Sequence, residues 1–104
     1  MQLQNTFIHH VFFWLKENND DNKKELIKGL EKLSSVKTIR QFHIGVPANT
    51  DREVIENTYN VSWMILFDNA ADQDSYQVDP VHLDFVKKCS HLWNKVTVFD
   101  TISA

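Results

Sequence analysis

The chain has 104 residues, and its 11 Lys and Arg against 14 Asp and Glu give a formal net charge of −3. This balance argues against a broad nucleic-acid-binding surface, which requires an excess of positive charge. The single cysteine, Cys89, excludes an intrachain disulfide and a zinc site built from cysteines. With only two glycines, the chain has no glycine-rich phosphate-binding loop.

The length fits a single domain over residues 1–104. No stretch reaches about 18 uninterrupted apolar residues, so no transmembrane helix is expected. Residues 1–6 are mostly polar and do not resemble a secretory signal peptide. Together with the lone cysteine, these features favour a cytoplasmic protein.

Four strands are predicted, at residues 6–15, 38–45, 59–67 and 95–101, where β-branched and aromatic residues concentrate. A helix is predicted from about residue 21 to 33, because Leu26, Leu30 and Leu33 recur at helical spacing. Gly29 is expected to be an exposed weak point of this helix.

The second half of the chain predicts two more helices. A short one spans residues 69–76 with Asn69 as its cap, and the next begins after Asp79, with Pro80 at its first position. The apolar face of the latter helix is expected to contain His82, Phe85, Val86, Cys89, Leu92 and Trp93. Residues 46–57 are predicted to form a loop with at most one short helical turn.

The first strand is apolar on both faces. Alternation places one set of side chains on one face (Phe7, His9, Val11, Phe13, Leu15) and a second set on the other (Ile8, His10, Phe12, Trp14). A strand of this kind must be covered on both sides. The β-α-β-β-α-β order predicts a ferredoxin-like α+β fold with an antiparallel sheet, whose helices cover only one face. We therefore expect a homodimer in which a second copy covers the other face.

His82 is the most informative of the five histidines. It follows the cap Asp79 by three residues and shares the apolar helix face, where burial and the helix N-terminus both disfavour a positive charge. A neutral imidazole there can serve as a general base or bind a ligand, although a structural core histidine fits the same pattern. Tyr76 can donate a hydrogen bond to a carbonyl or enolate oxygen, or simply bury its ring.

A metal site is not expected from the histidine spacing. His9 and His10 are neighbours on a strand and point to opposite faces, so they cannot chelate one ion together. No cofactor-binding motif is found in the sequence.

Two segments resemble a known family. Residues 8–16 (IHHVFFWLK) are similar to the first strand of the stress-responsive alpha/beta barrel (Dabb) family. Tyr76 followed by residues 79–85 (DPVHLDF) resembles its second signature, a Tyr and then His-Pro-x-His-x-x-Phe. The resemblance covers residues 7–101 and implies a ferredoxin-like protomer that dimerises sheet to sheet into an α/β barrel.

Most members of this family have no known activity, but the resemblance extends to one that has, a plant olivetolic acid cyclase. That enzyme closes a polyketide by aldol condensation without a cofactor, and its histidines and tyrosine correspond here to His9, Tyr76 and His82. The chain departs from it at Val61, where the cyclase has a histidine, and from the family signature at Asp79, which replaces the first histidine.

The resemblance and the residues together predict a homodimer with an apolar pocket for a small aromatic or acyl ligand. Any chemistry would be cofactor-free proton transfer beside a carbonyl, with His82 as base, Tyr76 as oxygen donor and His9 as an orienting or second acid–base group. The alternative is a non-catalytic, stress-related binding or structural dimer with structural histidines. No residue pattern favours the haem chemistry of other dimeric alpha/beta barrels.

Overall fold

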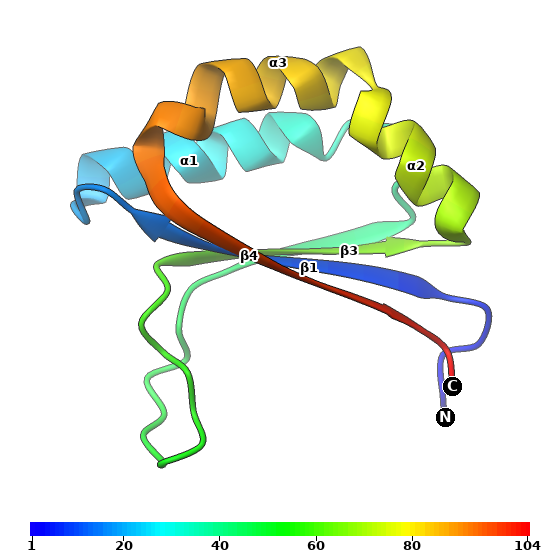
Figure 1. Ribbon diagram of the computed structural model, residues 1–104, viewed down its shortest axis with the longest axis horizontal. Coiled ribbons are helices and arrows are strands. Elements are labelled where there is room, and N and C mark those ends of the chain that lie inside the picture. The colour runs from blue at the N-terminus through cyan, green and yellow to red at the C-terminus, as the bar shows by residue number, and fades with distance from the viewer.

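The computed structural model of the protein describes residues 1–104 and contains one four-stranded antiparallel sheet in the order β2-β3-β1-β4. The strands are β1 (Phe7–Leu15), β2 (Gln41–Gly45), β3 (Val61–Phe67) and β4 (Trp93–Ile102). The helices are α1 (Asp20–Leu33), α2 (Ala70–Val78) and α3 (Pro80–Cys89), and all three lie on one side of the sheet (Figure 1). This arrangement confirms the predicted ferredoxin-like α+β fold.

The face of the sheet that meets the helices, here called the inner face, carries the core. Along β1 the buried residues alternate as predicted, and they are His9, Val11, Phe13 and Leu15. The intervening side chains on the outer face, from Ile8 to Trp14, are only half-buried. The period-2 pattern of β1 therefore assigned both faces correctly, and His10 points away from the helices.

Helix α1 begins where Asn19 caps it, with the Asn19 side chain accepting a hydrogen bond from the Asn22 N–H at 2.8 Å. Leu26, Leu30 and Leu33 are fully buried beneath it. The expectation that Gly29 is merely an exposed weak point is wrong.

Gly29 faces α3, where a Cβ atom would lie 2.6 Å from the Sγ of Cys89 and 3.3 Å from the Phe85 ring. The missing side chain lets α1 and α3 approach closely, which the spacing within α1 alone does not reveal.

The predicted caps of the later helices are both present. The Asn69 side chain accepts from the Asp72 N–H, and the Asp79 side chain accepts from the Val81 N–H, each at 2.8 Å. Helix α2 runs to Val78, two residues further than predicted.

Helix α3 does not reach Trp93. It ends at Cys89, and a 3-10 turn (Ser90–Leu92) leads into β4. Trp93 instead begins the strand, because it pairs with Leu15 across the sheet and the Lys16 N–H bonds to the Leu92 carbonyl at 2.9 Å. Strand β2 is also shorter than predicted, because it starts at Gln41.

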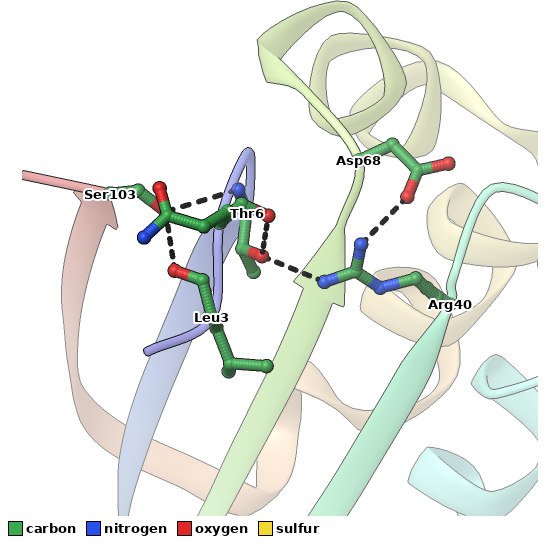
Figure 2. Close-up of polar contacts among 6 residues, drawn as sticks. Leu3, Thr6, Arg40, Asp68 and Ser103 are labelled. Carbon is green, nitrogen blue, oxygen red and sulfur yellow. Dashed lines mark hydrogen bonds and ion pairs between the residues drawn. The ribbon is translucent and has the colours of Figure 1, made fainter. Parts of the chain in front are cut away.

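Hydrogen bonds among four segments hold the two chain ends at the end of the sheet where β2 begins and β3 finishes (Figure 2). The Arg40 guanidinium donates to Asp68 and to the Thr6 hydroxyl, both at 2.9 Å. The Ser103 hydroxyl accepts from the Thr6 N–H and donates to the Leu3 carbonyl. These contacts secure the end of β4, the strand that carries part of the site described below.

The long connection between β2 and β3, residues 46–60, projects from the outer side of the sheet, opposite the helices (Figure 1). It contains no helix, and its one turn is closed by the Ile55 N–H and the Arg52 carbonyl at 2.9 Å. None of the three helices is long and apolar enough to cross a membrane.

Candidate functional site

A cavity of about 150 Å³ lies between the inner face of the sheet and helices α2 and α3. Four of its lining residues are polar or titratable, namely His9, Tyr76, Gln77 and His82, and the others are aliphatic or aromatic. The three residues singled out from the sequence thus line one cavity, although they come from β1, α2 and α3.

The three rings are close to one another. The centroids of Tyr76 and His82 are 4.7 Å apart, and those of His9 and Tyr76 are 5.9 Å apart. Tyr76 is therefore close to both imidazoles, and all three side chains border the same cavity.

Tyr76 is only 1% exposed, and its hydroxyl oxygen accepts a hydrogen bond from the Trp63 indole N–H at 3.1 Å. Burial raises the pKa of Tyr76 far above its ordinary range, with the Trp63 hydrogen bond acting weakly in the opposite direction. The phenol therefore stays protonated near neutral pH. Since no protein group accepts its proton, the O–H is free to donate to a ligand.

His82 is held by the C-terminal end of α2. Its Nδ1 lies 3.1 Å from the Gln77 carbonyl oxygen, and because a carbonyl can only accept, Nδ1 carries the proton. The lone pair is thus on Nε2. Burial is the main cause that lowers the pKa of His82, partly opposed by the bond to Gln77 and reinforced by His9. The imidazole is accordingly neutral at pH 7 and able to accept a proton.

His9 forms a pair that the sequence interpretation missed. Its Nδ1 lies 2.6 Å from a carboxylate oxygen of Asp100, which β4 places directly opposite His9 in the β1–β4 register. The carboxylate accepts a hydrogen bond from the Nδ1–H group, which orients the ring and leaves Nε2 without a protein partner. Alternation along β4 was the available signal, since it puts Asp100 on the inner face, but the strand register was needed to identify its partner.

The neighbouring His10 takes no part in this cavity. It lies on the outer face opposite Met64, and its pKa is lowered mainly by burial and further by His43 and His9. No group of three or more His, Cys, Asp or Glu side chains is arranged to hold a metal ion. Cys89, the last residue of α3, is buried, and burial raises the pKa of its thiol, so it is not poised as a nucleophile.

The element order and the four-stranded antiparallel sheet place the chain in the class of ferredoxin-like α+β proteins. The chain belongs to the stress-responsive A/B barrel (Dabb) domain family, whose model matches residues 7–103. No curated protein matches the sequence significantly.

Solved structures share the fold over nearly the whole chain. A Dabb family protein from Mesorhizobium loti has a TM-score of 0.79 at 20% identity and covers 95% of this chain and 97% of its own. The hydroxynitrile lyase from Passiflora edulis has a TM-score of 0.79 at 17% identity, covering 95% and 94%.

A dimeric protein of unknown function from Bacteroides fragilis has a TM-score of 0.73 at 18% identity, covering 98% and 100%. Similar structures from Thermobifida fusca and Jannaschia are likewise dimeric. These likenesses establish the fold of the chain, and dimers are common among proteins that share it.

Proposed function

We propose that the cavity binds a small, mostly apolar carbonyl compound and moves a proton at the carbon beside its carbonyl group, without a cofactor. The observation that carries this proposal is the meeting of a neutral imidazole with a free lone pair and a protonated phenol with a free O–H in one apolar cavity. Proton transfer beside a carbonyl needs both a base and an oxygen donor.

The geometry suggests a role for each side chain. Nε2 of His82 takes the proton from the carbon, the electron pair of the broken C–H bond forms the C=C bond of the enolate, and the carbonyl π electrons move onto oxygen. The Tyr76 O–H donates a hydrogen bond to that oxygen as its negative charge develops. Trp63 donates to the Tyr76 oxygen and thereby strengthens the phenol as a donor. His9, oriented by Asp100, is the second acid–base group.

One structural neighbour supports an enzymatic interpretation. The Passiflora edulis protein is a hydroxynitrile lyase, so a fold of this kind accommodates a lyase. At 17% identity this likeness supports the proposal through the fold and not through shared residues.

Deuterium exchange tests the chemistry without knowledge of the natural substrate. Acetophenone in D₂O should exchange its methyl hydrogens faster with the protein than in buffer, because His82 removes a proton and the resulting imidazolium, after exchange with solvent, returns a deuteron. His82→Gln should slow the protein-dependent exchange about a hundredfold or more, and Tyr76→Phe should slow it by a similar factor. Proton NMR of the methyl signal measures both rates.

His91→Gln is the matched control, because His91 is an exposed histidine on the 3-10 turn that does not line the cavity. It should exchange acetophenone at the wild-type rate. Wild-type exchange no faster than buffer, or equal exchange in His82→Gln, would refute the catalytic proposal.

A non-catalytic binding dimer is the second candidate. The observation that favours it is Val61, which is fully buried in the core at the position where the cyclase has a histidine. Binding of acetophenone without any exchange would support this candidate over the first.

We also infer that the outer face of the sheet forms a homodimer. It carries the half-buried Phe12 and Trp14 together with Phe99, which is 60% exposed, around a groove of about 280 Å³. A second copy would remove this apolar surface from water. The dimeric state of several proteins with this fold supports the inference.

Light scattering tests the dimer with a matched pair of variants. Phe99→Asp should give a monomer at micromolar concentration, because it would bury a carboxylate in the interface. Leu83→Asp places the same change on α3, where Leu83 is 56% exposed on the helical side, and should leave the dimer intact. A wild-type monomer, or dissociation by Leu83→Asp alone, would contradict this interface.

Our proposal places the protein in the cytoplasm, where a free thiol such as Cys89 persists. It includes no nucleic-acid partner, because the net charge is −3. Fractionation of cells that express the tagged chain would test the compartment directly.

A further inference from the structure

The cavity has no permanently cationic side chain in its lining, but a carboxylate is bonded to one of its lining residues. No Lys or Arg side chain lines it. The only carboxylate bonded to one of its lining side chains is that of Asp100, 2.6 Å from Nδ1 of His9. A ligand in the cavity therefore contacts no Lys or Arg side chain, and the carboxylate of Asp100 lies directly behind one of the side chains that it does contact.

We propose that the cavity selects uncharged carbonyl compounds about the size of one aromatic ring and rejects carboxylates, and that Asp100 sets this preference. The inference rests on the proposed function, since it names the class of ligand for the same site. It goes further by assigning selectivity to a residue that does not line the cavity itself.

Electrostatics disfavours an anionic ligand in this cavity. A carboxylate leaving water for an apolar cavity loses its hydration, and it stays bound only if a cation or several donors replace it. Here the two imidazoles are the only candidates. His82 is neutral because of its burial, and His9 already directs its Nδ1 proton to Asp100. The remaining interaction of an anionic ligand with Asp100 is repulsive.

The walls of the cavity favour an aromatic ligand. Phe13, Phe85 and Trp93 form an aromatic cluster, with centroids 4.8 Å apart for Phe13 and Trp93 and 5.8 Å apart for Phe85 and Trp93. Rings of this kind pack a further aromatic ring edge-to-face or offset. The volume of about 150 Å³ matches that of an engineered protein cavity that holds benzene, so a ligand with one aromatic ring fits.

The tryptophans supply a selective probe of binding. Trp63 donates its indole N–H to Tyr76 inside the cavity, whereas Trp14 donates its own to Thr58 on the other side of the sheet. A ligand at the proposed site should shift the ¹⁵N–¹H indole resonance of Trp63 and leave that of Trp14 in place. Trp14→Phe assigns the reference resonance.

Three ligands titrated at pH ~7.5, where carboxylic acids are ionised, separate charge from size. Acetophenone is neutral with one ring, benzoate is anionic with one ring, and 2-acetylnaphthalene is neutral with two rings. We expect acetophenone to shift Trp63 with a Kd at least about tenfold below that of benzoate, because benzoate loses its hydration in an apolar cavity that offers no cation and is also repelled by Asp100. The two-ring ketone should not saturate the shift.

Asp100→Asn then tests the residue. The amide oxygen can still accept from His9, but the negative charge is gone, so benzoate should bind more tightly while acetophenone changes little, and the Kd ratio should fall severalfold. A ratio near one in the wild type, or a ratio unchanged in a folded Asp100→Asn variant, would overturn the proposal. If that variant fails to fold, the wild-type ratio alone decides.

Saturating binding of the two-ring ketone would overturn the size limit. These outcomes are distinct from failure of the proposed function, because binding is read without any turnover. Neutral-ligand selectivity with no deuterium exchange would retain the ligand class and remove the chemistry. Deuterium exchange of acetophenone, together with equal affinities for acetophenone and benzoate, would retain the chemistry and remove the ligand class.

Discussion

Replacing Gly29 by alanine should destabilise the protein, although the same change stabilises most helices. Gly29 lies in the interior of α1, where a Gly-to-Ala change ordinarily contributes about 1 kcal/mol of helix stability. Here the new Cβ would meet Cys89 Sγ at 2.6 Å and the Phe85 ring at 3.3 Å. Crowding of this kind in a packed interior costs about 1–3 kcal/mol, because short buried side chains have little room to move. The net expectation is a loss of about 1 kcal/mol.

A double-mutant cycle isolates the cause. Cys89→Ala removes the crowding sulfur at a cost of about 1 kcal/mol for the lost buried atom. In that background Gly29→Ala should stabilise by about 1 kcal/mol, because the 2.6 Å contact with Sγ is gone and the remaining 3.3 Å approach to the Phe85 ring needs only a small adjustment. The coupling energy between the two positions is then about 2 kcal/mol, which is large for a pair of such small side chains.

Urea unfolding of the four proteins, followed by circular dichroism at one pH and one protein concentration, measures the cycle. Fixed concentration matters because dimerisation adds to apparent stability. If Gly29→Ala stabilises the otherwise wild-type protein by the full helix-propensity amount, Gly29 is an ordinary exposed position and the close α1–α3 approach is wrong. Additive effects would exclude the Cys89 contact as the reason.

Two further predictions concern the site itself. Tyr76→Phe should lower the unfolding free energy by about 1–3 kcal/mol, because it leaves the buried Trp63 N–H without an acceptor. Tyr59→Phe is the control, since it removes a phenolic oxygen that makes no hydrogen bond in the structure. It should change the unfolding free energy little in the same denaturant assay. Burial lowers the folded-state pKa of His82 and His10 below the ordinary 6.5, so the unfolded chain binds protons more readily. Their stabilising contribution is complete above about pH 6.5 and declines as the pH falls towards the folded-state pKa values. Urea midpoints should therefore fall with acidification, less steeply in His82→Gln, and an NMR titration placing the His82 pKa at or above 6.5 would contradict this.

The local features of the fold were predictable because they depend on neighbours within one segment. Alternation along β1 separated His9 from His10, and the caps Asn69 and Asp79 marked two helix starts that the structure retains. The predicted element boundaries that proved wrong are those that tertiary contacts determine. Trp93 belongs to β4 because Leu15 pairs with it across the sheet, a contact that no periodicity within residues 79–93 contains.

The candidate site divides in the same way. Residue type and spacing were enough to single out Tyr76 and His82, and the resemblance to the family added His9. Their partners were not predictable: Asp100 is 91 positions from His9 and depends on the β1–β4 register, and Trp63 depends on how α2 packs over β3.

The sequence by itself thus determined which side chains face inward, because that follows from the geometry of a single strand or helix. The tertiary structure alone decided which of them meet. Burial, strand register and the close approach of α1 to α3 arise only when segments far apart in the chain pack together. A chain of 104 residues with a net charge of −3 excludes many functions, but the neutral His82 beside a protonated Tyr76 exists only in the packed molecule.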